Sequence, residues 1–341
     1  MLTIFTTAKP FKGHIAVIQR NALKSWKLLH PDVEVILFGD DAGAAEICLE
    51  LGLRHEPAIE CREDGTKSVR SVFGRAQEIA RYSILCYVNC DIVLTQDFLR
   101  ALEAVRGWQK QFLMVGRRWD LDVTEPIEFS QDGWAEALVQ RAKTGGFQRL
   151  HHNIDYFAFP RDLYREIPDL MIGRNWWDQW LVWRAADQGA PVVDVSEIVC
   201  AVHQNHDYSY HPQGMNGVWF GEGSFRNKKI AGGRSHLHSI EDANYWLTPA
   251  GFVANRFYWL VPTKRVVREE LATIRHYFKN RIWFTLLDFT RPVRAALGLR
   301  SDVVKRVIPK RERDRLHPFD RNWTPKIRWE RDTDNRDGPN A

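Results

Sequence analysis

Short apolar runs alternate with helical patterns through the first third of the chain. Apolar and β-branched runs predict buried strands, and apolar residues three and four positions apart predict helices between them. The predicted strands are Leu2–Thr7, Val33–Phe38 and Ile84–Val88, and the predicted helices are Ile15–Leu29, Ala42–Leu51, Val69–Arg81 and Gln96–Val105. Repeats of this kind, about 30 residues long, form a parallel sheet that helices cover on both faces. The predicted fold class is therefore α/β, with ligands expected beyond the carboxyl ends of the strands.

The pattern becomes less regular from Phe112 onward. The predicted strands here are Phe112–Val115, Ile154–Phe159 and Pro191–Val202, the predicted helices are Trp134–Ala142 and Trp176–Ala186, and a polar stretch covers Arg117–Ser130. A sheet that continues through a mixed region fits this order. We therefore expect a mostly parallel central sheet with some departures in its second half.

The C-terminal part differs in charge from the rest of the chain. The formal net charge is +5, but residues 256–315 carry 16 Lys and Arg against 6 Asp and Glu. This segment shows long basic helical patterns, and the residues after it are charged and rich in turn formers. We predict a main domain over 1–254, a basic helical extension over 255–315 and a loosely ordered tail over 316–341. The extension either packs on the main domain or docks on an anionic membrane surface.

Five cysteines without a C-x-x-C pair favour neither a disulfide framework nor a cysteine-based zinc site. The N-terminus shows no signal-peptide pattern, and no apolar stretch approaches the roughly 20 residues of a membrane span. We expect a cytoplasmic protein, or one that is peripheral at the inner face of a membrane. The aromatic residues of the basic segment form no recognisable stacking motif, so no nucleic-acid partner is expected.

Asn89-Cys90-Asp91 directly follows the predicted strand Ile84–Val88. A carboxylate at the carboxyl end of a buried strand can face a ligand site and hold Mg²⁺ or Mn²⁺ together with substrate phosphates. The alternative is that Asp91 caps the following helix, although Thr95 is better placed for that. Asp91 is the candidate metal carboxylate.

Three histidines fall within nine residues, at His203, His206 and His211, after another apolar strand. They can form a metal site, supply a general base or belong to a polar loop. An imidazole on the same rim of the sheet as Asp91 would complete an oxygen-rich metal site. Zinc is less attractive because no H-E-x-x-H pattern is present. Whether His203 or His206 would be the ligand stays open.

A third cluster, Gly173-Arg174-Asn175-Trp176-Trp177-Asp178-Gln179-Trp180, opens a predicted helix. Asp178 can be an ordinary acid of a first helical turn, favoured by the helix dipole. Trp faces beside a carboxylate, however, also suit a sugar ring and its hydroxyl groups. Core packing could use two of these three tryptophans.

Walker, G-x-G-x-x-G and G-x-S-x-G motifs are missing, which disfavours kinase, dehydrogenase and esterase functions.

Taken in order, these motifs resemble those of nucleotide-sugar glycosyltransferases with the GT-A fold, a Rossmann-like α/β architecture. The residues that carry the resemblance are Phe5-Thr6-Thr7-Ala8-Lys9-Pro10, Asn21, Trp26, Phe38-Gly39-Asp40-Asp41, Arg75 to Ala80, Tyr87 to Ile92, Asp155-Tyr156-Phe157, Gly173-Arg174, Trp177-Asp178 and His203 to Tyr208. The resemblance spans roughly residues 1–240. It implies that the main domain is a GT-A catalytic domain that uses Mn²⁺ or Mg²⁺.

The resemblance also implies site residues. By position, Thr6, Thr7 and Lys9 would contact the nucleoside, Asp40 the base or ribose, and Arg75 the diphosphate or donor. Asn89 and Asp91 would match the D-x-D motif, Asp178 would be the catalytic carboxylate on a helix that faces the acceptor, and His203 the late metal ligand. Asn89 departs from the motif because it replaces the first acid. The metal would then be held by Asp91 and His203.

The leading functional hypothesis is transfer of a sugar from a nucleotide-diphosphate donor to a saccharide or lipid-linked acceptor hydroxyl, in polysaccharide or glycolipid synthesis. A sugar nucleotidyltransferase is an alternative, but the Gly-rich loop usual in that class is missing after Leu2–Phe5. A non-catalytic nucleotide-sugar or carbohydrate-binding protein is the other alternative, because Asn89 weakens the metal motif.

Overall fold

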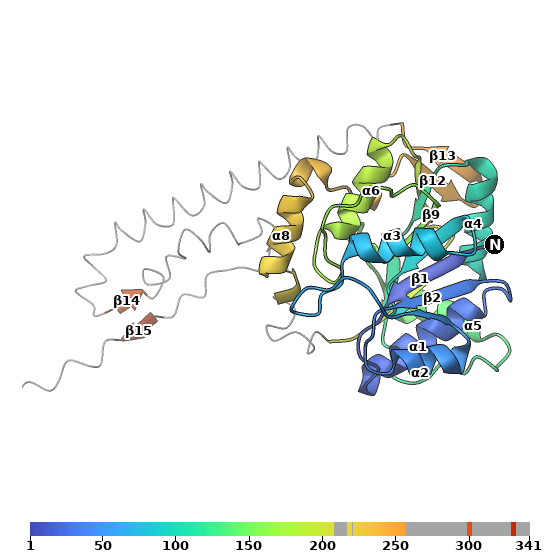
Figure 1. Cartoon of the computed structure of the whole chain (residues 1–341), viewed down its shortest axis with the longest axis horizontal. Coiled ribbons are helices and arrows are strands. Elements are labelled where there is room, and N and C mark those ends of the chain that lie inside the picture. Colours follow the sequence, from blue (N-terminus) through green and yellow to red (C-terminus); the bar gives the residue numbers. More distant parts are fainter. Residues whose placement is uncertain (208–216, 220, 257–298, 302–328, 332–341) are drawn as a thin grey trace, which may run out of the picture. The chain divides into compact units, whose positions relative to one another are not determined.

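The chain divides into two units, Met1–Pro262 and Thr263–Ala341. The computed structural model describes residues 1–207, 217–219, 221–256, 299–301 and 329–331 (Figure 1). In the second unit, the described residues form one antiparallel pair, β14 (Leu299–Ser301) with β15 (Trp329–Arg331). The predicted basic helical segment 255–315 and the predicted tail 316–341 otherwise lie outside the described residues.

A nine-stranded sheet forms the centre of the first unit. Its spatial order is β13 (Gly251–Ala254), β12 (Tyr245–Thr248), β10 (Val192–Asp194), β6 (Leu113–Val115), β9 (Tyr156–Pro160), β4 (Ile84–Val88), β1 (Thr3–Thr7), β2 (Glu34–Phe38) and β3 (Arg54–Glu56). Strands β3, β2, β1 and β4 run parallel, as do β6, β10 and β12. β9 is antiparallel to both β4 and β6, and β13 is an antiparallel edge. The predicted mostly parallel α/β sheet is confirmed.

Helices cover both faces of this sheet (Figure 1). The described helices of the first unit are α1 (Gly13–Lys27), α2 (Ala44–Leu51), α3 (Val69–Ile79), α4 (Gln96–Trp108), α5 (Trp134–Gly145), α6 (Trp177–Asp187) and α8 (Glu222–Ile230), with short 3₁₀ turns at Arg234–His236 and Ile240–Asp242. Of these, α5 packs on the second sheet described below. Successive side chains of a strand point to opposite faces. Ile4 therefore packs in the core under α1, α2 and α4, whereas Phe5 packs in the core under α3 and α6.

A second, four-stranded sheet holds β5 (Ile92–Val93), β11 (Ala201–Gln204), β7 (Arg118–Leu121) and β8 (Phe147–Gln148), in that order. β11 is antiparallel to β5 and parallel to β7. Residues of α5 pack against it in a small separate core. Because β5 begins four residues after β4 ends, this second sheet starts directly beside the carboxyl end of β4.

Two predictions on the second half of the chain were wrong in detail. Pro191–Val202 is not one strand but two, β10 in the main sheet and β11 in the small one. The chain turns between them because the Asp194 carboxylate accepts a hydrogen bond from the Ser196 N–H and from its hydroxyl. The polar stretch Arg117–Ser130 contains β7, whose charged side chains are buried against neighbouring charges and so escape a hydrophobic pattern.

The order of the main sheet places two loops together. The chain passes from β1 outward to β2 and β3 and then returns to β4 on the other side of β1, so the direction of winding reverses between β1 and β4. Such a reversal opens a crevice for ligands beyond the carboxyl ends of the strands. Lys9 follows β1 and Asp91 follows β4, so both lie at this point.

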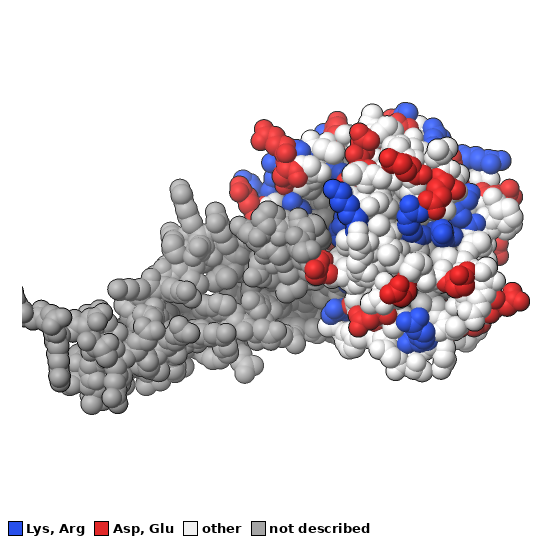
Figure 2. All heavy atoms as spheres, turned by 90° about the horizontal axis from the view of Figure 1, so that it is seen from below, with Lys and Arg blue, Asp and Glu red and all other residues white. Residues whose placement is uncertain are grey.

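The described surface shows mixed charge, and the described helices include none suited to spanning a membrane. Lys and Arg are interspersed with Asp and Glu over the part of the face in Figure 2 that belongs to the described residues. Within the same residues, we find no helix with both the length and the apolar character that a bilayer crossing requires.

Candidate metal centre and its surroundings

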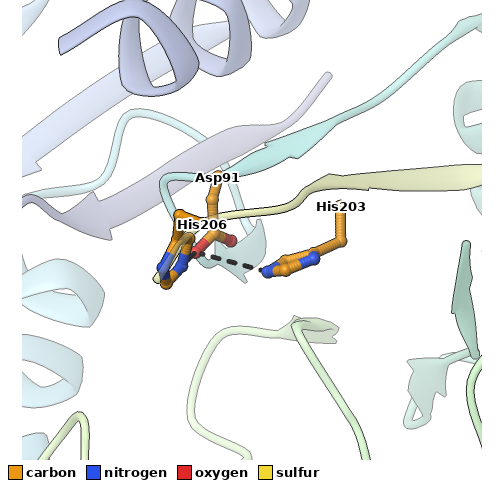
Figure 3. A group of neighbouring side chains, drawn as sticks. All are labelled: Asp91, His203 and His206. Atoms are coloured by element: carbon orange, nitrogen blue, oxygen red, sulfur yellow. Dashed lines mark hydrogen bonds and ion pairs between the residues drawn. The ribbon is translucent and has the colours of Figure 1, made fainter. Parts of the chain in front are cut away.

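Asp91, His203 and His206 bring one carboxylate and two imidazoles together (Figure 3). One ligand atom from each lies within 4.8 Å of the others. Asp91 Oδ2 is 3.2 Å from His206 Nε2 and 3.9 Å from His203 Nε2. Both histidines left open by the sequence therefore face Asp91. The alternative that Asp91 caps α4 is wrong, because β5 separates Asp91 from that helix.

Strand register explains why His203 reaches Asp91. In the small sheet, His203 pairs with Ile92 of β5 on one side and with Asp120 of β7 on the other. Asp91 directly precedes Ile92, and its carbonyl accepts a hydrogen bond from the Gln204 N–H at 3.1 Å. His206 follows two residues after β11 ends. The pairing of β5 with β11 thus joins residues more than a hundred positions apart.

The second nitrogen of each imidazole faces an oxygen. His206 Nδ1 is 2.7 Å from the carbonyl of Asp207. His203 Nδ1 is 3.2 Å from Asp120 Oδ1, an ion-pair distance without the geometry of a hydrogen bond. In the neutral tautomer that carries its proton on Nδ1, next to this oxygen, the Nε2 atom is unprotonated and can bind a metal. In that tautomer the Nε2 atoms of both rings and the Asp91 carboxylate would converge on a divalent cation, which would replace the hydrogen bond between His206 Nε2 and Asp91 Oδ2.

Asp91 itself supports this fit. Its Oδ1 is buried and has no hydrogen-bond partner among the described residues. Burial alone would raise the pKa of Asp91, but attraction to His203, the hydrogen bond with His206 and the charge of Lys9 hold that pKa well below its usual range. The carboxylate is therefore ionised, and an open ligand atom is available in a donor set of one oxygen and two nitrogens.

Lys9 adds a positive charge to the same place. Its Nζ lies 3.4 Å from His206 Nε2, and its backbone is held by a pair of hydrogen bonds with the Gln19 side chain. Burial lowers the pKa of Lys9, while the nearby Asp91 opposes that shift. An ammonium beside a metal ligand is well placed for a phosphate oxygen.

Asn89, two residues before Asp91, is held by Asp155. Its Nδ2 donates to Asp155 Oδ1 at 2.6 Å, and its backbone N–H donates to the Asp155 carbonyl. Asp155 Oδ2 in turn accepts from Arg118 Nη1 at 2.8 Å. The Asn89 amide is thus fixed by a buried ion pair, whereas Asp91 faces the histidines.

The other residues predicted to bind the donor lie in different surroundings. Thr6 is buried, and its hydroxyl donates to the Val88 carbonyl at 2.6 Å, so this hydroxyl ties β1 to β4. Thr7 ends β1 and is partly buried, next to the phenol of Tyr87. Asp40 is exposed after β2. Arg75 is exposed on α3 and pairs with Glu56 and Glu78, so its described contacts do not include the Asp91 group.

Asp178 lies in the first turn of α6 and is partly buried. Burial raises the pKa of Asp178 to about 7, with a smaller contribution in the same direction from Asp155 and an opposing one from backbone hydrogen bonds. The preceding Trp177 fixes this turn, because its ring packs on Tyr87 of β4 and Phe157 of β9. Asp178 is therefore anchored beside the strands that carry Asn89 and Asp155, with a pKa suited to proton transfer.

The expected wall of tryptophans is only partly present. Trp177 and Trp180 are each 5% exposed and belong to the core under α3 and α6, so they cannot present a face to a sugar. Trp176 remains partly exposed, with Lys228 Nζ 5.0 Å from the centre of its ring. Its φ of 88° is in the left-handed region, which is unusual for a bulky residue.

Sequence reasoning missed the charged residues of β7. Arg118 and Asp120 are buried, and they connect His203 to Asp155. The alternating polarity of Arg118-Trp119-Asp120-Leu121 is a weak strand signal that the surrounding polar residues hide. Nothing local in that sequence indicates that both charges face inward.

No protein-family model and no curated protein matches the sequence. Among solved structures, the chain is similar to glucosyl-3-phosphoglycerate synthase from Mycobacterium tuberculosis in complex with Mn²⁺, uridine diphosphate and glucosyl-3-phosphoglycerate. The identity is 12% and the TM-score 0.38, over 60% of this chain and 72% of that chain. It is also similar to residues 1–349 of S. aureus TarS in complex with UDP-GlcNAc, at 10% identity and a TM-score of 0.41, over 60% of this chain and 58% of that chain.

Since the TM-scores are below 0.5, the function proposed below rests on the residues of this site.

Proposed function

We propose that the protein is a metal-dependent glycosyltransferase that moves a sugar from a nucleotide-diphosphate donor to an acceptor hydroxyl. The observation that carries this proposal is the convergence of Asp91, His203 and His206 at the winding reversal of an α/β sheet, beside Lys9. A divalent cation held there would neutralise the charge that develops on a leaving diphosphate.

The donor set favours Mn²⁺ over Mg²⁺. Mg²⁺ prefers oxygen ligands, whereas imidazole nitrogens suit the transition metals better. Two of the three protein ligands here are imidazoles. Open coordination positions would remain for diphosphate oxygens, and Lys9 would donate to the same phosphates.

Asp178 is the proposed general base that takes the proton of the acceptor hydroxyl. A base is most effective when its pKa lies near the working pH, and burial brings the pKa of Asp178 to about 7. Trp176 is the proposed aromatic contact for a sugar ring, since it is the partly exposed member of the cluster. Thr7 and Asp40 remain proposed donor contacts at the ends of β1 and β2, and Arg75 remains a prediction.

The test is incubation of the full chain with a panel of nucleotide sugars and Mn²⁺, with and without a set of saccharide and lipid-linked acceptors. Release of nucleoside diphosphate that requires the metal supports the proposal, and Asp91→Asn should abolish it. Asp32→Asn makes the same chemical change on an exposed carboxylate that pairs with His30, and it should leave turnover unchanged.

Two other outcomes contradict the proposal in distinct ways. Pyrophosphate release from a nucleoside triphosphate and a sugar phosphate would identify a nucleotidyltransferase. Saturable, Mn²⁺-dependent binding of a nucleotide sugar without turnover for any acceptor would identify a binding protein.

A further inference from the structure

The carboxylate of Asp120 lies behind His203, on the side away from Asp91. In the parallel pair of β7 and β11 these two residues are directly opposite each other, so their side chains project from the same face of the small sheet. Asp120 Oδ1 is 3.2 Å from His203 Nδ1, and His203 Nε2 is 3.9 Å from Asp91 Oδ2. The imidazole thus stands between two carboxylates.

Two arginines hold Asp120 in this position. Arg118 Nε is 2.9 Å from Asp120 Oδ1, and Arg149 Nε is 2.5 Å from Oδ2. Asp120 is only 6% exposed, and the rotamers of a buried, doubly paired carboxylate are restricted. The carboxylate cannot turn away from His203 without losing an ion pair.

Arg118 connects Asp120 to the residues that hold Asn89. Its Nη1 pairs with Asp155 Oδ2, and Asp155 Oδ1 accepts from the Asn89 amide. A continuous series of contacts therefore runs from His203 through Asp120, Arg118 and Asp155 to Asn89. One buried arginine, Arg118, thus pairs with the carboxylates that contact His203 and Asn89.

We propose that Asp120 is a positioning residue for the metal site: its carboxylate, 3.2 Å from His203 Nδ1, favours the tautomer with the proton on Nδ1 and so directs an unprotonated Nε2 at the cation. This inference rests on the metal part of the proposed function. A carboxylate behind a metal-bound imidazole fixes the ring and raises its basicity, and loss of such a partner typically weakens metal binding 10- to 100-fold. Arg118 and Arg149 supply the charge that lets Asp120 remain there as an anion.

A purely structural role for Asp120 makes a different prediction. If it served only to pair Arg118 and Arg149, its removal would lower thermal stability and leave the affinity for metal unchanged. The two roles are separated by measuring both quantities on the same variants.

The experiment is titration of the full chain with Mn²⁺, without nucleotide, followed by electron paramagnetic resonance of free Mn²⁺. We expect Asp120→Ala to raise the Kd about 10- to 100-fold and Asp120→Glu, which keeps an acceptor, to recover part of that loss. Asp194→Asn is the matched control. Asp194 is also buried, at 8% exposure, but it ends β10 of the main sheet and its carboxylate bonds to Ser196 just beyond that strand, so its removal should leave the Kd unchanged.

The tautomer of His203 gives a second readout that needs no variant of Asp120. In ¹⁵N-histidine-labelled wild-type protein without metal, the His203 resonances, assigned by their loss in His203→Gln, should report a protonated Nδ1 and a bare Nε2. A predominant Nε2–H tautomer in the wild type would overturn the inference, even if every Asp120 variant failed to fold. So would wild-type Mn²⁺ affinity in Asp120→Ala. Failure of the wild type itself to bind Mn²⁺ would instead refute the metal part of the proposed function.

Discussion

The side-chain amide of Asn89 donates a hydrogen bond to Asp155 Oδ1 at 2.6 Å. Asn89 lies two residues before Asp91, whose carboxylate faces both histidines of the metal site. An amide suits this place because it can donate a hydrogen bond to an anion, whereas a carboxylate cannot. Asn89, which replaces the first acid of the D-x-D motif, thus has the side chain that can donate a hydrogen bond to Asp155.

The first prediction concerns Asn89→Asp, which restores the acid of the motif. Two carboxylates at this distance cannot both be ionised, so one must have a raised pKa. Stability gained by sharing a proton at low pH is lost as the pH rises through that raised value. We therefore expect the melting temperature of the variant to fall further below that of the wild type at pH 8 than at pH 5. Improved Mn²⁺ affinity with unchanged stability at pH 8 would contradict this account. Asn205→Asp is the control: it creates a similar pair with Asp122, but on the exposed surface, where water screens the repulsion, so its stability should depend less on pH.

The second prediction is metal choice. Removal of divalent cations with a chelator should abolish nucleoside diphosphate release, and Mn²⁺ should restore it at lower concentration than Mg²⁺, because two imidazoles take part. Loss of a residue that only hydrogen-bonds to a metal ligand weakens metal binding about 10- to 100-fold. Because His206 is proposed as a direct ligand, His206→Ala should weaken Mn²⁺ binding at least as much. Equal potency of the two metals with wild-type affinity in His206→Ala would rule out His206 as a ligand.

The third prediction uses the pKa of Asp178. Because a general base must be ionised, kcat/KM should rise with pH through about 7, the value to which burial raises this pKa. Asp178→Asn should lower kcat by about 10²- to 10⁴-fold and abolish the rise of kcat/KM with pH, while the affinity for the donor stays unchanged.

Asp178 also affects stability, with a sign that can be checked. An unfolded Asp titrates near 3.9, so the folded chain binds more protons between about pH 4 and pH 7. The free energy of unfolding therefore falls as the pH rises through this window. Asp178→Asn should gain stability over wild type at pH 8 and not at pH 4. A loss of stability at pH 8 with unchanged kcat would favour the role of an ordinary helix-terminal acid.

The fourth prediction separates two neighbouring tryptophans. Trp177→Ala removes a ring packed on Tyr87 and Phe157 and should cost about 3–5 kcal/mol of stability. Trp176→Gly should cost little, since glycine adopts a φ of 88° without strain, but it should raise the KM for the acceptor. Thermal melts and acceptor kinetics on both variants test this, and an unchanged KM in a folded Trp176→Gly would exclude the sugar contact.

The fifth prediction concerns the basic segment 256–315, most of which lies outside the described residues. If it docks on an anionic membrane surface, the full chain should co-sediment with anionic liposomes and not with neutral ones, since each Lys or Arg near the headgroups contributes about 1 kcal/mol. A chain that ends at Pro262 should lose this binding. Negligible binding by both chains would exclude membrane docking, and insolubility of the shorter one would favour a segment packed on the first unit.

The local pattern of the chain was sufficient for most of the fold. The strand Ile84–Val88 has the predicted bounds, and α1, α3 and α6 begin within two residues of their predicted starts. Buried β-branched runs and apolar residues at helical spacing are consequences of burial that can be read within a few positions. The same pattern placed Asp91 at the end of a central strand.

The metal centre depended on contacts between distant segments. His203 and His206 meet Asp91 only because β11 leaves the main sheet and pairs with β5, and Asp120 stands behind His203 only because β7 pairs with β11 in that register. Tertiary contacts also explain why Trp177 is buried and Trp176 is partly exposed, because the Trp177 ring of α6 packs on Tyr87 of β4 and Phe157 of β9. Periodicity shows which side of a strand is buried, but register is set by the pairing of whole strands, and that pairing exists only in the tertiary structure.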